Sequence, residues 1–277
     1  MAANSTIEWT DHTFNPWTGC TNISPGCDNC YAEAWSKRSG QVKWGNSPRK
    51  RTTESYWKAP HMWQKRAAEF AAQHGRRQRV FCASLADVFD NKAEETWRAD
   101  LFRVIKATPS LDWQLLTKRP QNISKMLPTD WGSDGYHNVW LGFTAEDQTR
   151  FDQRKRFIQD IPAAVWFVSY EPAIGPLRIL DTDPKPDWLI CGGESGSGAR
   201  PMKCHWARDV VEDCMRRGIA PFFKQWGAAS NNPLVQEEGF HPSTVKESDP
   251  HGKGGGLLDG KLFRNFPLPR IKADNAA

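Results

Sequence analysis

Three cysteines lie close together in a loop rich in turn-forming residues. Cys20, Cys27 and Cys30 have the spacing C-x6-C-x2-C within residues 18–31, which also contain glycine, proline, serine and asparagine. Three thiolates on a cluster of four irons leave one iron without a protein ligand. We therefore predict that these cysteines hold a [4Fe-4S] cluster with one open coordination position.

An open iron position allows a small molecule to bind the cluster directly. S-adenosylmethionine can chelate such an iron through its amino and carboxylate groups. One electron then breaks its C5′–S bond and releases a 5′-deoxyadenosyl radical, which abstracts a hydrogen atom from a substrate. This chemistry belongs to the cofactor, and the protein positions the reactants. An electron donor of the flavodoxin or ferredoxin type is expected as a partner.

Two other interpretations of the three cysteines remain open. A structural zinc ion usually takes four ligands, and His12, Cys82 or His61 is available as the fourth. Alternatively, the thiols carry no ligand and are simply buried. The remaining cysteines fall within strand or helix patterns and are expected to be core residues: Cys82, Cys191, Cys204 and Cys214.

A basic segment containing several tryptophans, residues 33–66, follows the cysteines. Its bases greatly outnumber its acids, and aromatic residues are interleaved with them. Bases that neutralise phosphates, together with rings that stack on nucleobases, are typical of nucleic-acid surfaces. The alternative is a solvated basic loop whose tryptophans pack inward. We select as candidate substrate-binding residues Arg49, Lys50, Arg51 and Trp57.

Short apolar runs recur through the middle of the chain at the spacing of βα units. Such runs are typical of strands buried on both faces of a parallel sheet. The predicted strands cover residues 13–14, 79–84, 113–117, 139–143, 165–169, 188–191 and 220–223. Helical periodicity is clearest over residues 93–107 and 206–217. The sequence predicts an α/β fold, a partial or complete (β/α) barrel, with an open doubly wound sheet as the alternative.

We expect a single domain, with the barrel over residues 1–230. Residues 231–277 would form a C-terminal loop and a lid or edge segment of the same domain, because residues 231–256 are polar and rich in glycine and proline. The sequence has no apolar run long enough to span a membrane and no export signal at its N-terminus. A cytoplasmic protein without membrane contact is therefore expected. The odd number of cysteines, 7, argues against a disulfide framework.

Polar residues follow nearly every predicted strand. The loops at the carboxyl ends of parallel strands form the site in α/β barrels, so these side chains should converge at one opening. Ser84, Asp87 and Thr144 could instead be helix caps. The candidate residues are Ser84, Asp87, Thr117, Lys118, Arg119, Thr144, Glu171, Gly192, Gly193, Glu194, Lys224 and Gln225.

Several of these motifs together resemble one family over residues 7–267. The matching runs are Asn-Pro-Trp-Thr-Gly-Cys at Asn15, Ser-Pro-Gly-Cys-Asp-Asn-Cys-Tyr-Ala at Ser24, Leu-Thr-Lys-Arg-Pro at Leu116, Gly-Gly-Glu-Ser-Gly at Gly192, Phe-Lys-Gln-Trp-Gly at Phe223 and Leu-Leu-Asp-Gly at Leu257. The chain thus resembles the phage-associated three-cysteine family of radical-SAM-like proteins, a domain of unknown function distantly similar to spore photoproduct lyase. The resemblance implies a radical-SAM-like barrel with the cluster after its first strand.

The sequence departs from the usual radical-SAM pattern in three places. The first gap between cysteines is six residues instead of three, the aromatic residue Tyr31 follows the last cysteine instead of preceding it, and the second strand ends in Ser-Leu-Ala-Asp instead of Gly-Gly-Glu.

The resemblance also implies roles for the residues at the strand ends. Ser84 or Asp87 would hold the methionine amino group of S-adenosylmethionine, and Lys118 or Arg119 its carboxylate. Gly192 and Gly193 would allow close approach of the adenine, and Thr117 and Thr144 belong to the same cofactor site. Substrate or ribose would face Glu171, Glu194 and Lys224, the candidate catalytic residues, and Arg200 and Gln225, the candidate substrate-binding residues.

The sequence therefore predicts a radical S-adenosylmethionine enzyme that modifies or repairs a nucleic-acid base, with modification of phage DNA in the host cytoplasm as the favoured setting. A base in a duplex would have to be flipped out to be reached. Two alternatives are a radical enzyme acting on a free nucleotide or small metabolite, and a non-enzymatic, zinc-stabilised nucleic-acid-binding protein.

Overall fold

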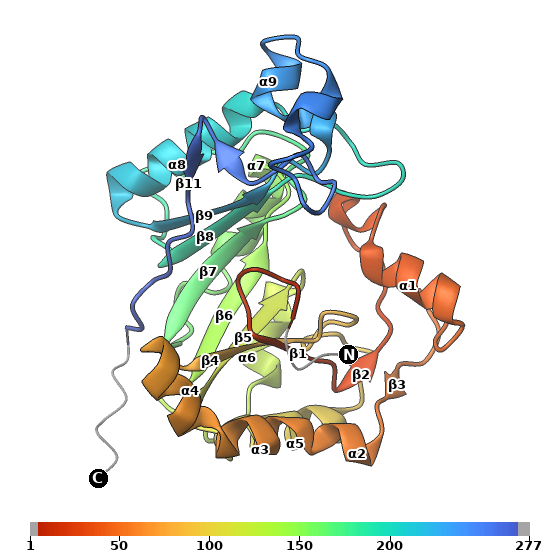
Figure 1. Cartoon of the computed structure of the whole chain (residues 1–277). Helices are drawn as coiled ribbons and strands as arrows, with labels where there is room; N and C mark the ends of the chain where they lie inside the picture. The colour runs from red at the N-terminus through yellow and green to blue at the C-terminus, as the bar shows by residue number, and fades with distance from the viewer. Residues whose placement is uncertain (1–4, 271–277) are drawn as a thin grey trace.

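The computed structural model describes residues 5–270. Its centre is a parallel sheet of 7 strands in the order β1-β4-β5-β6-β7-β8-β9. The sheet is curled into a half-barrel (Figure 1). Its strands are β1 (His12–Phe14), β4 (Gln78–Cys82), β5 (Leu111–Thr117), β6 (Val139–Thr144), β7 (Val165–Tyr170), β8 (Trp188–Gly192) and β9 (Ala220–Gln225).

The strand order confirms a partial barrel and excludes the doubly wound alternative. Each strand pairs with the next one in the sheet without a reversal of order, from β1 at one edge to β9 at the other. A doubly wound sheet requires such a reversal. The strands predicted from apolar runs all occur, within a few residues of the predicted bounds.

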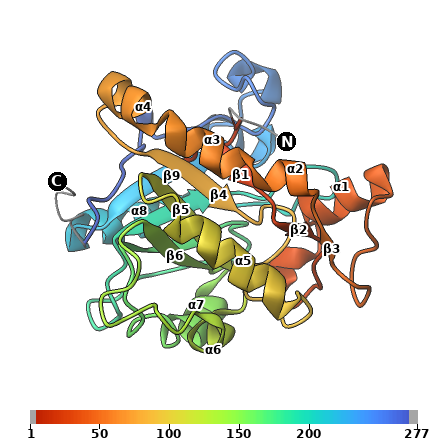
Figure 2. The ribbon, with the colours of Figure 1, turned by 90° about the horizontal axis from the view of Figure 1, so that it is seen from below.

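Both faces of the sheet are buried, which explains the nearly continuous apolar runs. Along β8, Leu189 and Cys191 face the outer core, whereas Trp188 and Ile190 face the inner one. The helices lie on the outer side of the sheet (Figure 2). They include α4 (Ala67–His74), α5 (Glu95–Lys106), α6 (Ile123–Met126), α7 (Gln148–Lys155) and α8 (Cys204–Arg217).

The inner core is closed by segments from both ends of the described chain. Trp9 packs against Phe81 and Trp188 with ring centroids 4.6 and 6.1 Å apart, and Phe266 packs against Trp188 at 5.3 Å. Aromatic side chains therefore fill part of the interior of the half-barrel.

The segment between the cysteines and β4 forms several short elements. These are β2 (Trp17–Thr18), the 3₁₀ turn η1 (Pro25–Cys27), α1 (Tyr31–Ser39), β3 (Lys50–Arg51), α2 (Glu54–Trp57) and α3 (Ala59–Lys65). β3 pairs antiparallel with β2. In Figure 1, α1 faces the open side of the half-barrel.

The C-terminal segment runs back along the β9 edge of the sheet. The backbone N–H of Phe223 donates to the carbonyl of Phe263 at 2.9 Å, and that of Asn265 donates to the carbonyl of Pro221 at 3.1 Å. Short elements interrupt the loop predicted for residues 231–256. Within and around it lie η3 (Ala229–Asn231), α9 (Pro233–Gln236), η4 (Pro242–Val245), β10 (Leu257–Leu258) and β11 (Lys261–Leu262). No helix within residues 5–270 is both long and apolar enough to cross a membrane.

Candidate functional site

A cavity of about 620 Å³ opens at the carboxyl ends of the strands, and all three cysteines line it. Its size is in the range of small-molecule sites. Most residues predicted at the strand ends also line it: Ser84, Asp87, Thr117, Lys118, Arg119, Thr144, Glu171, Gly193, Glu194, Lys224 and Gln225. The sequence prediction that these loops converge is therefore confirmed, whereas Gly192 and Arg200 lie outside the cavity lining.

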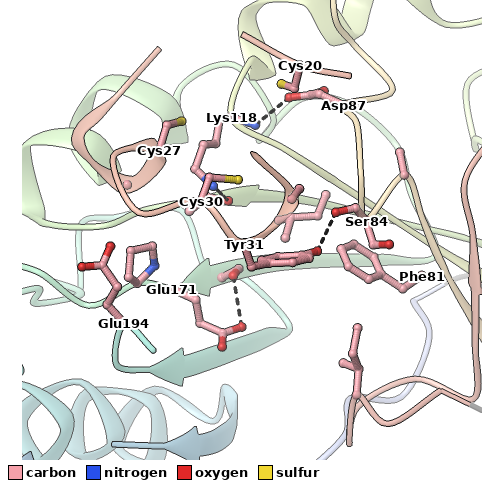
Figure 3. Close-up of a pocket in the computed structure, with 18 of the residues that line it drawn as sticks. Cys20, Cys27, Cys30, Tyr31, Phe81, Ser84, Asp87, Lys118, Glu171 and Glu194 are labelled. Atoms are coloured by element: carbon pink, nitrogen blue, oxygen red, sulfur yellow. Dashed lines mark hydrogen bonds between the residues drawn. The ribbon is translucent and has the colours of Figure 1, made fainter. Parts of the chain in front are cut away.

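The cysteine side chains point into the same part of the cavity (Figure 3). Cys20 follows β2, Cys27 ends η1, and Cys30 is the N-cap residue of α1. In the part of the chain that the structure describes, no fourth cysteine and no histidine line the cavity. His12 Nε2 instead donates to Gln78 Oε1 at 3.1 Å, and the His12 ring stacks on Trp63.

The residues that line the cavity show whether one of the expected side chains could act as a fourth metal ligand beside the three cysteines. Neither Cys82, which is fully buried, nor the exposed His61 lines the cavity. Of the fourth zinc ligands expected from the sequence, His12, Cys82 and His61, none therefore lies on the cavity with the three thiols. Within the described residues, no group of three or more His, Cys, Asp or Glu side chains is already arranged to hold a metal ion.

The cysteine loop is attached to β6 through Glu146, a fully buried residue just beyond that strand. The Ser24 hydroxyl donates to Glu146 Oε1, and Arg154 Nη1 donates to Glu146 Oε2 at 2.6 Å. Gly26 lies directly against the carboxylate, where an added Cβ would be 2.4 Å from Glu146 Cγ. Only glycine fits at this contact, and Glu146 was not selected from the sequence.

A second attachment joins Cys20 to β4 and β5. Arg119 Nη1 donates to Cys20 Sγ at 3.4 Å and to Asp87 Oδ2 at 3.0 Å, and Arg119 Nη2 donates to the carbonyl of Thr21 at 2.9 Å. Burial raises the pKa of the Cys20 thiol to about 11; the charge of Asp87 adds to this effect and Arg119 opposes it. A metal that binds Cys20 must therefore displace its proton.

A third attachment lies at the end of β8. Arg200 donates to both oxygens of Glu194, through Nε at 2.9 Å and Nη2 at 2.6 Å, and to the carbonyl of Pro25 at 2.8 Å. Asn29 also donates to Glu194 at 2.9 Å. Burial opposes the charged form of Glu194, but the hydrogen bonds from Arg200 outweigh it and lower the pKa of the carboxyl. Arg200 thus braces the cysteine loop from outside the cavity.

An ion pair between Glu171 and Lys224 forms part of the cavity wall, with Lys224 Nζ 2.8 Å from Glu171 Oε1. Gly192, the last residue of β8, and Gly193, directly after it, are closely approached by other groups of the protein. An added Cβ on Gly192 would lie 2.8 Å from Glu171 Oε1, and one on Gly193 would lie 2.1 Å from the carbonyl oxygen of Trp226. These close approaches are made by neighbouring protein groups, where the resemblance implied an adenine.

The remaining cofactor candidates differ in how many internal partners they have. Asp87 accepts hydrogen bonds from the Thr117 hydroxyl, the Phe89 and Lys118 amides and the Arg119 side chain. Among residues 5–270, in contrast, the only hydrogen-bond partner of Lys118 Nζ is the Thr144 hydroxyl, at 3.4 Å. Lys118 is therefore the cation near the cysteines that remains available to a ligand.

Tyr31 forms a wall of the cavity that the sequence did not assign to the site. Tyr31 is 59% exposed, and its hydroxyl donates to the carbonyl of Ser84 at 2.6 Å (Figure 3). The Ser84 hydroxyl takes part in hydrogen bonds with Asn15. The position of Tyr31 directly after Cys30 could have indicated its place at the site, since a residue next to a ligand must lie near the bound group.

The basic segment is only partly exposed. Arg49 is buried and bonded to Asp90, and Trp57 is buried beneath Arg51, whose guanidinium lies 4.1 Å from the ring centroid. Arg51 also pairs with Asp100 at 2.8 Å. Of the selected residues, Lys50 alone is exposed. Arg49 and Trp57 therefore offer no surface to a ligand in this structure, and Arg51 is held by internal partners.

Comparison with known proteins gives a family without an assigned function. A family described as "Protein of unknown function (DUF5131)" matches residues 4–267, and the chain belongs to this family. No curated protein and no solved structure matches the chain.

Proposed function

We propose that this protein is a radical S-adenosylmethionine enzyme that modifies or repairs a nucleic-acid base. The observation that carries the proposal is the placement of Cys20, Cys27 and Cys30 on one cavity, which no other cysteine and no histidine of residues 5–270 lines. When bound to these thiolates, a [4Fe-4S] cluster supplies the electron that cleaves S-adenosylmethionine.

The chain's own residues would bind and orient the cofactor. Lys118 is proposed to hold the methionine carboxylate, because Arg119 is already paired with Asp87. Ser84 is favoured for the amino group, because the Asp87 carboxylate already accepts four hydrogen bonds within the protein. The exposed ring of Tyr31 offers a face on which a purine can stack.

Glu171 and Lys224 are proposed to face the substrate. Their ion pair on the cavity wall gives one group that accepts hydrogen bonds and one that donates them. Polar groups of this kind can fix the orientation of a base through its edge. Gln225 lines the same wall, and its Nε2 donates to the carbonyl of Gly193 at 3.0 Å.

The test is production of 5′-deoxyadenosine. Anaerobically reconstituted protein, given S-adenosylmethionine and a reductant, is expected to release 5′-deoxyadenosine, and changing any one of Cys20, Cys27 or Cys30 to Ala is expected to abolish this. Cys204→Ala, in a thiol outside the cavity, is the matched control. Unchanged cleavage in all three cavity variants would refute the proposal.

The exposed bases near the cavity support nucleic acid as the substrate. Lys37 and Arg38 are exposed on α1, Lys43 is exposed in the loop that follows it, and Lys50 is exposed at the start of β3. Trp44, in the same loop, lines the cavity itself. Contacts with several phosphates give binding that weakens steeply with salt, whereas a neutral metabolite gives almost no such dependence. Salt titration of oligonucleotide binding therefore separates the two substrate classes.

A further inference from the structure

Two basic residues of the cavity wall have no acidic partner within residues 5–270. Its acidic residues are Asp87, Glu171 and Glu194. Asp87 pairs with Arg119, Glu171 with Lys224, and Glu194 with Arg200 outside the cavity. Two lining bases, Lys118 and Lys253, have no carboxylate within salt-bridge distance among residues 5–270.

Hydrogen bonds within the C-terminal segment hold the backbone of Lys253 in place. The Asp249 carboxylate, which is 7% exposed, accepts from the Lys253 backbone N–H at 2.8 Å and from that of Gly254. Asn232 Nδ2 donates to the carbonyl of Gly254 at 2.8 Å, and the Trp226 N–H donates to the carbonyl of Gly255 at 3.2 Å. These contacts fix the backbone of Lys253 against the end of β9.

The packing of this loop allows little freedom. Gly254 has a φ of +84°, and an added Cβ would lie 2.3 Å from the carbonyl oxygen of Ala228. His251 and Gly252 are exposed, whereas Lys253 is half-buried against the cavity. A half-buried lysine that lines a cavity and lacks an acidic partner among residues 5–270 is expected to meet an anion of the ligand.

S-adenosylmethionine cannot satisfy both lysines, because it has a single carboxylate. Lys118 lies near the cysteines and suits that carboxylate, which leaves Lys253 for a second anion. We propose that Lys253 binds a phosphate group of the substrate, so that the substrate is a nucleotide unit and not a free base or nucleoside. This inference rests on the proposed function for the identity of the first anion.

The experiment compares the full-length, anaerobically reconstituted protein with Lys253→Gln. The matched control is Lys246→Gln, an exposed lysine of the same segment that does not line the cavity. The probes are the four deoxynucleoside 5′-monophosphates, the corresponding nucleosides and a mixed-sequence single-stranded oligonucleotide, each titrated at fixed salt. Lys253→Arg keeps the charge and tests whether charge restores binding.

We expect Lys253→Gln to raise the Kd of a monophosphate about 10-fold or more, because a charge-assisted hydrogen bond is lost. Nucleoside binding should stay unchanged, Lys246→Gln should behave as wild type, and Lys253→Arg should restore most of the affinity. A parallel loss for the oligonucleotide identifies a backbone phosphate, whereas a loss for monophosphates alone identifies a free nucleotide.

Equal Kd values of wild type and Lys253→Gln for a monophosphate would overturn the inference. Equal losses of affinity for nucleoside and monophosphate in Lys253→Gln would also overturn it, as would wild-type protein that binds none of the probes. A different result would refute the proposed function. Wild-type protein that makes no 5′-deoxyadenosine refutes radical chemistry, while a phosphate affinity that depends on Lys253 is read from the titration alone.

Discussion

The contact between Gly26 and Glu146 gives a sharp prediction about how the cysteine loop is held. In Gly26→Ala the new Cβ would lie 2.4 Å from Glu146 Cγ, 2.5 Å from Oε1 and 2.8 Å from Cδ. Glu146 is fully buried and paired with Arg154 and Ser24, so its side chain cannot move aside without breaking the buried ion pair. The loop must move instead.

The size of the effect follows from the cost of overpacking. Inserting a methyl group into a well-packed site costs about 1–3 kcal/mol. Because about 1.4 kcal/mol corresponds to a tenfold change in an equilibrium constant, the attached position of the loop should be disfavoured by about 5- to 150-fold. Asp28→Ala is the control, since it removes from the same loop only an exposed ion pair with Arg200, worth about 0–1 kcal/mol.

Two readouts measure this change. Amide hydrogen exchange over residues 20–30 should accelerate in Gly26→Ala while exchange in the sheet stays slow, and iron retained against a chelator after anaerobic reconstitution should fall by a similar factor. Both quantities should stay close to wild type in Asp28→Ala. If Gly26→Ala keeps both the exchange protection and the iron of wild type, the loop is not held at Glu146 and this reasoning is wrong.

Two more predictions concern stability and substrate binding. Burial opposes ionisation of Asp213, but its hydrogen bonds, above all the one from Arg178, outweigh burial and lower the pKa of the carboxyl below 3.8. Ionised Asp213 therefore stabilises the fold above pH 3.8. This contribution is lost as the pH falls through the lowered pKa of the folded state. Asp213→Asn should lower the free energy of unfolding by about 1–2 kcal/mol at neutral pH, and should reduce the dependence of that free energy on pH at acid pH. An unchanged pH dependence at acid pH would contradict this role of Asp213. Changing Lys43 and Lys50 together to Gln should reduce the slope of log Kd against log salt concentration for oligonucleotide binding by about one to two. Lys261→Gln is the control. Equal slopes in the double variant and in wild type would show that these lysines do not contact nucleic acid.

Much of the fold was predictable because it depends on local pattern. Buried parallel strands need apolar side chains on both faces, so each strand left a short apolar run in the sequence. The polar residues after those runs had to meet at one edge of the sheet, and most of them line the cavity. The convergence of the three cysteines on this cavity followed from their place after the first strand.

The choice of partners among these residues could not be predicted from the sequence. Glu194 pairs with Arg200, and Glu146 holds Ser24, which is 122 positions away. Such pairings depend on where strand-end loops meet in space, and no local periodicity encodes that. For the same reason, the buried Trp57 could not be distinguished by sequence pattern from Trp44, which lines the cavity.

The most direct test of the central claim is electron paramagnetic resonance of the anaerobically reconstituted and reduced protein, with and without S-adenosylmethionine. If Cys20, Cys27 and Cys30 leave one iron open, the preparation holds about four irons per chain, and its spectrum changes when S-adenosylmethionine is added. A colourless, zinc-loaded protein, or a cluster spectrum that S-adenosylmethionine leaves unchanged, would contradict the account.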